Sequence, residues 1–174
     1  MTQTERPVIG LDLSLTSTGI ALPDGTTEAI SVPMKDVTRL IALRNIIMEK
    51  INQHKHPLVV IEGYSFAQRN SQAHALGELG GVIRVALVEA DCTIAVVAPT
   101  QRAKFATGKG NAGKSEVVSA ISARTGIVWS GKGADDKADA WILQEMGLTA
   151  LGRSRYDWPK ANLAALEKTE WPSA

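Results

Sequence analysis

Two short apolar segments that each carry a carboxylate constrain this chain more than any other feature. Residues 8–13 read Val-Ile-Gly-Leu-Asp-Leu, and residues 58–62 read Leu-Val-Val-Ile-Glu. Short apolar runs of this kind are typical of strands, and a run without polar alternation is typical of a strand covered on both faces. An isolated carboxylate in such a strand is often structural. Its occurrence in two strands indicates that Asp12 and Glu62 have a shared role, because a buried charge is unfavourable without a partner.

The remaining patterns indicate an α/β order. Residues 19–22 and 27–32 read as strands separated by the turn Pro-Asp-Gly-Thr, so the chain opens as an antiparallel meander. Apolar residues then recur at three- to four-residue steps from Asp36, a candidate N-cap, to about His54, which predicts a helix. A helix over 70–90, a strand over 93–98, a short helical turn after Pro99, a helix over 113–124 closed by Gly126 and a last helix from about residue 134 follow.

The length of 174 residues suits one domain, which we place at residues 1–150. Residues 151–174, rich in Trp, Pro and charge, are expected to form a C-terminal tail that is surface-packed or mobile. The single cysteine, Cys92, is interpreted as a core residue and fits a reducing compartment. Without a signal-peptide pattern or an apolar run of the ~20 residues that span a bilayer, we expect an intracellular protein that does not associate with a membrane.

A third acidic segment opens the last helix. Asp136 and Asp139 are spaced i, i+3, which places both side chains on one helical face, while Trp141 and Ile142 can anchor the helix on the sheet. Asp135 has a simpler explanation as an N-cap or as a charge favoured by the helix dipole. Four carboxylates therefore stand out as candidate catalytic and metal-binding residues: Asp12, Glu62, Asp136 and Asp139.

Four converging carboxylates would repel one another unless divalent cations lay between them. Oxygen ligands suit Mg²⁺, with Mn²⁺ as a substitute, and the absence of Cys/His ligand spacing argues against zinc. The histidines His54, His56 and His74 are interpreted as surface or packing residues. Two carboxylate-bound metal ions are a common means of cleaving a phosphodiester, so we expect two ions in each site.

A basic cluster lies between the strands and the acidic helix. The net charge is only +1, so the charge of the whole molecule argues neither for nor against a polyanionic partner. The cluster is nearly free of acids except for Glu116, and could be either a solvated face or a phosphate-binding face. Its members are Arg102, Lys104, Lys109, Lys114, Arg124 and Lys132.

Ordered segments of this chain resemble those of the RuvC-type Holliday-junction resolvases of the ribonuclease H-like superfamily. They are the strand and turn at 9–19, the acidic strand end at 60–66 with the helix that follows it to Gly81, the basic segments at 98–104 and 113–115, and the acidic pair at 136–140. The resemblance spans about residues 8–145. The segment 126–133 and the chain after Leu148 depart from the pattern, which leaves the cut-site preference and any motor-protein partner open.

This resemblance implies a mixed five-stranded sheet, three antiparallel strands followed by parallel ones, flanked by helices. It implies a homodimeric, metal-dependent endodeoxyribonuclease that resolves four-way junctions by paired symmetrical nicks. Metal binding and catalysis would fall to the four carboxylates named above, phosphate contacts to Lys104 and Lys114, and base stacking to Phe66 or, second, Tyr64. Arg69, Arg102 and Lys109 complete the expected DNA contacts.

Three alternatives remain open at this point. Residues 108–115 match the P-loop pattern G-x-x-x-x-G-K-S, which would suggest a nucleotide-binding ATPase, although residues 99–107 intervene between the strand and this loop. The turn at 12–19 also resembles the first phosphate loop of actin-like ATPases and sugar kinases, but those enzymes need two such domains. A RuvC-like nuclease with broader flap or fork specificity is the third.

Overall fold

A five-stranded mixed sheet forms the centre of the protein. The computed structural model describes residues 5–63 and 71–172. Its strands are β1 (Val8–Asp12), β2 (Thr18–Ala21), β3 (Thr27–Ile30), β4 (Leu58–Glu62) and β5 (Thr93–Val97), in the order β3-β2-β1-β4-β5. β2 is antiparallel to β1 and β3, whereas β1, β4 and β5 are parallel. The predicted sheet of three antiparallel strands followed by parallel strands is confirmed.

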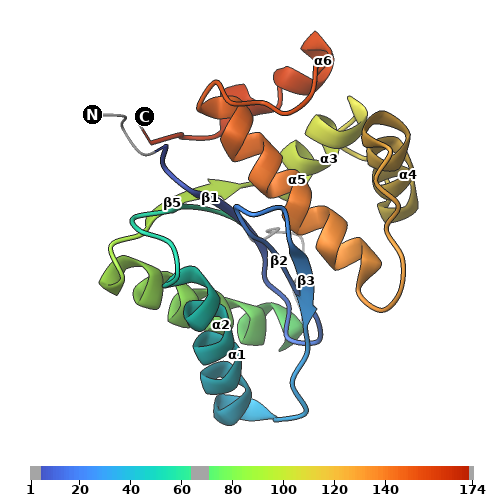
Figure 1. Cartoon of the computed structure of the whole chain (residues 1–174). Helices are drawn as coiled ribbons and strands as arrows, with labels where there is room; N and C mark the ends of the chain where they lie inside the picture. The colour runs from blue at the N-terminus through green and yellow to red at the C-terminus, as the bar shows by residue number, and fades with distance from the viewer. Residues whose placement is uncertain (1–4, 64–70, 173–174) are drawn as a thin grey trace.

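Helices cover both faces of this sheet (Figure 1). One face carries α1 (Asp36–Ile51) and α2 (Ser71–Glu89). The other carries α5 (Ala134–Ala150), flanked by α3 (Pro99–Thr107), α4 (Lys114–Thr125) and α6 (Lys160–Leu163), with the 3-10 helix η1 (Leu166–Lys168) following α6. α5 contacts β1, β2, β3 and β4, so it is the helix that packs most broadly on the sheet.

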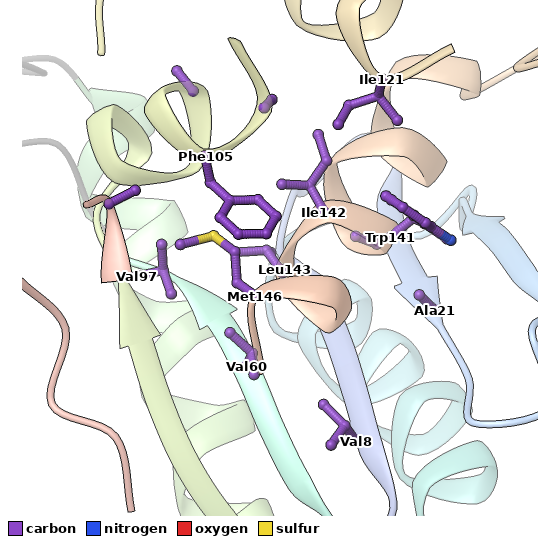
Figure 2. Packing of buried hydrophobic residues seen from close by; sticks show 14 of the residues in the cluster. Val8, Ala21, Val60, Val97, Phe105, Ile121, Trp141, Ile142, Leu143 and Met146 are labelled. Atoms are coloured by element: carbon purple, nitrogen blue, oxygen red, sulfur yellow. The ribbon is translucent and has the colours of Figure 1, made fainter. Parts of the chain in front are cut away.

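The alternation of side chains along the strands divides the core in two. Ile9 and Leu11 face α1 and α2, whereas Val8 and Val60 belong to the core beneath α5. Figure 2 shows Phe105 of α3 directed into this second core, close to Leu143 and Met146 of α5. Because residues two apart share a face, Asp12 and Glu62 lie on the α5 side of the sheet.

Two glycines allow α5 to approach the sheet closely. A Cβ atom at Gly10 of β1 would lie 1.9 Å from the carbonyl oxygen of Ala140, and one at Gly19 of β2 would lie 2.0 Å from that of Asp136. No side chain fits in either place. The glycines of the first motif therefore fix where the acidic end of α5 rests.

The helix boundaries correct two predictions. Lys35, not Asp36, is the N-cap of α1, and Asp36 is the first helical residue, with φ of 50°. The helical turn expected after Pro99 is a nine-residue helix, α3, because Phe105 and Ala106 supply it with a buried face. Gly126 ends α4 in the left-handed conformation, as predicted.

The segment after α5 packs against α3 and α5. The ring centroids of Trp158 and Phe105 are 4.3 Å apart, and Asn162 Nδ2 donates a 2.7 Å hydrogen bond to the carbonyl oxygen of Phe105. The carboxylate of Glu145, fully buried in α5, accepts hydrogen bonds from Arg155 and from Trp158 Nε1. Among the helices described, none is both long and apolar enough to cross a membrane.

Candidate active site

The carboxyl ends of the parallel strands β1 and β4 place two acids at one edge of the sheet. Asp12 is the last residue of β1 and Glu62 the last of β4, and the two strands are hydrogen-bonded neighbours. α5 crosses this edge on the face that both acids occupy and brings Asp139 to them. The first two acidic motifs and Asp139 of the third are therefore brought together by the fold, as predicted from their positions in the strands and helix.

Arg102 lies among these acids. From α3, its guanidinium donates hydrogen bonds through Nε to Glu62 Oε2 and through Nη1 to Asp139 Oδ1. All three side chains are largely buried, with exposed fractions of 11% for Arg102, 18% for Glu62 and 5% for Asp139. Sequence reasoning counted Arg102 as a DNA contact and missed this pairing, which its place in a basic segment does not reveal.

Burial and mutual repulsion disfavour the ionised form of two of the acids. Desolvation, followed by the charges of Glu62 and Asp139, raises the pKa of Asp12 well above its usual value, against a smaller opposing effect of Arg102. Desolvation likewise raises the pKa of Asp139 to about 6, although Arg102 lowers it. At Asp12 the guanidinium therefore offsets only part of the repulsion from Glu62 and Asp139.

Asp136 lies one turn before Asp139 on α5, and its negative charge contributes to the raised pKa of Asp12. Its carboxylate lies beside Gly133, where an added Cβ would be 3.3 Å from Oδ2. Among the described residues, the hydrogen bonds of the Arg102 guanidinium go to Glu62 and Asp139 and not to Asp136. Within the described part of the chain, no group of three or more His, Cys, Asp or Glu side chains is arranged to hold a metal ion as it stands.

Lys114, which was expected to contact DNA, pairs with an acid of the protein. Lys114 Nζ lies 3.1 Å from Asp135 Oδ2, and this contact raises the pKa of Lys114 and lowers that of Asp135. The N-cap of α5 is Gly133, so the prediction that Asp135 caps this helix is wrong. Asp135 lies in the first turn of α5, where the helix dipole favours a negative charge, as the other interpretation of this residue expected. Its pairing with Lys114 was not anticipated.

The other members of the basic cluster differ in their partners and in their exposure to solvent. Lys109 Nζ lies 3.6 Å from Glu116 Oε1. Arg124 donates to the carbonyl oxygen of Asp157 and stacks on Trp158, with 5.2 Å from Cζ to the ring centroid, so it holds the C-terminal segment. Lys104 is half-buried on α3, and Lys132 is exposed before α5. The predicted contacts Tyr64, Phe66 and Arg69 lie outside the described residues.

The P-loop pattern at 108–115 lies in the wrong structural context for nucleotide binding. In a P-loop the glycine-rich segment connects a buried strand directly to a helix. Here β5 leads into α3, and only after α3 does the loop lead into α4 at Lys114. The match in letters is therefore not accompanied by the strand-loop-helix geometry that cradles phosphates.

Comparisons with known proteins agree on one family. The model of the family "Crossover junction endodeoxyribonuclease RuvC" matches residues 8–143. A curated protein of that name from Carboxydothermus hydrogenoformans is 32% identical over 111 residues, covering 62% of this chain and 70% of its own length. Its namesake from Nocardia farcinica is 30% identical over 148 residues, covering 78% and 77% respectively.

A solved structure shares the fold at lower sequence identity. It is described as T. thermophilus RuvC in complex with Holliday junction substrate. The two structures superpose with a TM-score of 0.68 at 20% sequence identity, and the match covers 88% of this chain and 100% of the other. Thermus thermophilus RuvC in a second structure gives a TM-score of 0.64. The fold described above is thus the one found in those proteins.

Proposed function

Because this chain belongs to the RuvC family of crossover junction endodeoxyribonucleases, we propose that it resolves four-way (Holliday) DNA junctions by metal-dependent hydrolysis with paired symmetrical nicks. The observation that carries the proposal is the meeting of Asp12, Glu62 and Asp139 at the carboxyl edge of β1 and β4. A family match over residues 8–143 includes all three of these acids and Asp136.

The donor chemistry of the site fits a divalent cation. Every candidate ligand is a carboxylate oxygen, the donor that Mg²⁺ and Mn²⁺ prefer. Burial raises the pKa values of Asp12 and Asp139, and repulsion from Glu62 adds to it, so a bound cation would favour the ionised form of both acids. Asp12, Glu62, Asp136 and Asp139 would hold two Mg²⁺ ions, with Mn²⁺ as a substitute. When bound, such ions activate water and stabilise the leaving oxygen of a phosphodiester.

The chain's own cations would hold the DNA. Lys114, at the N-terminus of α4, and Lys104 of α3 are proposed to contact phosphate. The ion pair with Asp135 holds the ammonium group of Lys114 beside the first turn of α5, at the acidic edge of the sheet where Asp12 and Glu62 lie. Phe66, or second Tyr64, would stack on a base, and Arg69, Arg102 and Lys109 would add charge. We propose products with 5′-phosphate and 3′-hydroxyl ends, and a homodimer whose two sites cut symmetrically.

Cleavage of matched substrates tests this function. A four-way junction, a flap, a fork and a linear duplex are incubated with the protein in Mg²⁺, and the cuts are mapped on every strand. Paired symmetrical nicks in the junction alone are expected. Cuts in flaps or forks at equal rates would instead favour a nuclease of broader branched-DNA specificity.

Two variants connect the activity to the site. Asp12→Asn and Glu62→Gln should abolish cleavage while leaving junction binding intact, since neither change removes a proposed DNA contact. Glu49→Gln, on the exposed surface of α1 across the sheet from the site, is the matched control and should cut at the wild-type rate. Retained cleavage by Asp12→Asn in Mg²⁺ would remove the assignment of this residue.

A further inference from the structure

The guanidinium of Arg102 bonds to the same carboxylates that the proposed function assigns to metal binding. We propose that Arg102 is an internal counter-ion of the carboxylate cluster formed by Asp12, Glu62 and Asp139. A divalent cation must displace the Arg102 guanidinium from Glu62 and Asp139 to bind, so this one side chain sets the metal affinity of the site. The inference rests on the proposed function, because it assumes that the cluster binds metal.

The contacts of Arg102 bridge two structural elements. Nε bonds to Glu62 at the end of β4, and Nη1 bonds to Asp139 in the second turn of α5. With 11% of its side chain exposed, the arginine lies inside the cluster rather than over it. Each carboxylate thus gives one of its two oxygens to the guanidinium, and a cation coordinated by both acids would compete for the same lone pairs and the same space.

The charges make this a competition rather than a fixed salt bridge. Three carboxylates, those of Asp12, Glu62 and Asp139, face one guanidinium, so the cluster retains an excess of negative charge that a divalent cation would neutralise better. A guanidinium stays protonated in proteins, so Arg102 cannot yield its place by losing a proton. It can do so only by moving its side chain.

The position of Arg102 gives the displaced side chain a destination. It stands in the first turns of α3 and shares that helix with Lys104, a proposed phosphate contact. A long side chain leaving the cluster keeps its charge close to the site, where a DNA phosphate is the complementary group. Metal loading and the release of a phosphate-binding cation would then be one event, which assigns Arg102 a positioning role.

Metal binding without DNA tests the exchange. Mn²⁺ affinity is measured by electron paramagnetic resonance for the full-length wild type, Arg102→Gln, Arg102→Lys and the remote control Arg44→Gln. Removing two charge-assisted hydrogen bonds that compete with the ion should tighten binding in Arg102→Gln by about tenfold or more. Arg102→Lys should lie between, and Arg44→Gln, which also removes one positive charge, should match the wild type.

A second measurement needs no variant to fold. In wild-type protein, the Nε–H resonance of Arg102 is followed by nitrogen-15 NMR as diamagnetic Mg²⁺ is added. The resonance should shift as the bond to Glu62 is lost, with the same midpoint as metal binding. Unchanged or weaker Mn²⁺ binding in Arg102→Gln, or an Nε–H resonance that stays in place at saturating Mg²⁺, would overturn the exchange.

These outcomes separate the two proposals. If wild-type protein binds no Mn²⁺ and cuts no junction, the proposed function fails, and the counter-ion role fails with it. If wild-type protein binds Mn²⁺ and cuts junctions while the Arg102 measurements show no competition, only the counter-ion role fails.

Discussion

The backbone of Gly19 touches the backbone of Asp136: a Cβ atom on the glycine would lie 2.0 Å from the aspartate's carbonyl oxygen. β2 and the first turn of α5 are therefore in direct contact beside the acidic edge. Gly10 makes the same kind of contact with Ala140, one turn later on α5. Backbone contacts at two successive turns therefore hold α5 against the sheet. The placement of α5 depends on the absence of a Cβ atom at both glycines.

Gly19→Ala should destabilise the protein, since the new methyl group meets backbone rather than a flexible side chain. We expect a loss of about 1–3 kcal/mol in the free energy of unfolding, the range for overpacked cores. Urea denaturation measures it. The matched control is Gly77→Ala in α2, where nothing lies within 4 Å of the added carbon and alanine favours the helix, so the sign should be opposite. Equal stability of both variants would contradict the close contact.

Asp12→Asn should stabilise the protein in the presence of a chelator at pH 8. The folded-state pKa of Asp12 is raised, chiefly by desolvation, above the usual value of 3.8. The protonated carboxyl is thus favoured by folding, and this stability is complete below pH 3.8 and lost as pH rises through the folded pKa. The melting temperatures of variant and wild type should therefore converge toward pH 4. A less stable variant at pH 8 would contradict the burial of the charge.

Metal affinity should rise with pH across the range in which Asp139 ionises. Its folded-state pKa is about 6, raised mainly by desolvation, and a carboxylate must be deprotonated to bind a cation. Titrations with Mn²⁺ from pH 5 to pH 8.5 should show tighter binding throughout the upper half of this interval, with Asp12 extending the rise because its pKa is also raised. Binding that is constant above pH 5 would refute the assignment of these two acids as ligands.

Lys114→Gln should weaken junction binding and lower the slope of log affinity against log salt by about one, the loss expected for one phosphate contact. Asp135→Asn provides the opposite change, because it frees the ammonium 3.1 Å from its carboxylate. Since exposed ion pairs contribute only about 0–1 kcal/mol, the gain in affinity should be at most severalfold. Filter binding at four salt concentrations measures both. If ATP hydrolysis appeared and was lost with Lys114, the nucleotide-binding alternative would return.

Glu145→Gln should destabilise the whole protein although Glu145 is not one of the candidate site residues. Its fully buried carboxylate is paired with Arg155 Nε at 2.6 Å, and the variant leaves that cation without its charge partner. We expect a loss of about 1–3 kcal/mol, the range for leaving buried hydrogen-bonding groups unpaired, because the side chain of Arg155 is 33% exposed and water can solvate its charge. Glu116→Gln, which breaks the exposed pair with Lys109, should change stability by less than about 1 kcal/mol. Thermal unfolding followed by circular dichroism compares the two.

The sequence was sufficient for the sheet and for the place of the acids. Short apolar runs predicted the strands, three- to four-residue spacing predicted the main helices, and the family resemblance implied the mixed sheet. A carboxylate closing an apolar run marked Asp12 and Glu62, because burial makes such a charge unfavourable. The spacing of Asp136 and Asp139 predicted one helical face. In the structure only Asp139 meets Arg102, since a residue three positions earlier lies a turn away along the helix axis.

The pairings of the basic residues could not be predicted in this way. Arg102, Lys114 and Arg124 look alike in a charge count, yet one is buried among acids, one pairs with Asp135 and one holds the C-terminal segment. Their partners are 21 to 40 residues distant in sequence. Which cation meets which acid depends on how α3 and α4 pack, and packing has no local sequence signal.

α5 bears the acidic pair near its N-terminus and the buried anchor Glu145 nearer its C-terminus. One helix therefore forms a large part of the core and also positions Asp136 and Asp139. Because both parts belong to one helix, the acidic end of α5 cannot shift independently of the half that Glu145 anchors. Heat or mutation that loosens the anchored half should also misalign the acids, so activity and structural integrity should fail together rather than in sequence.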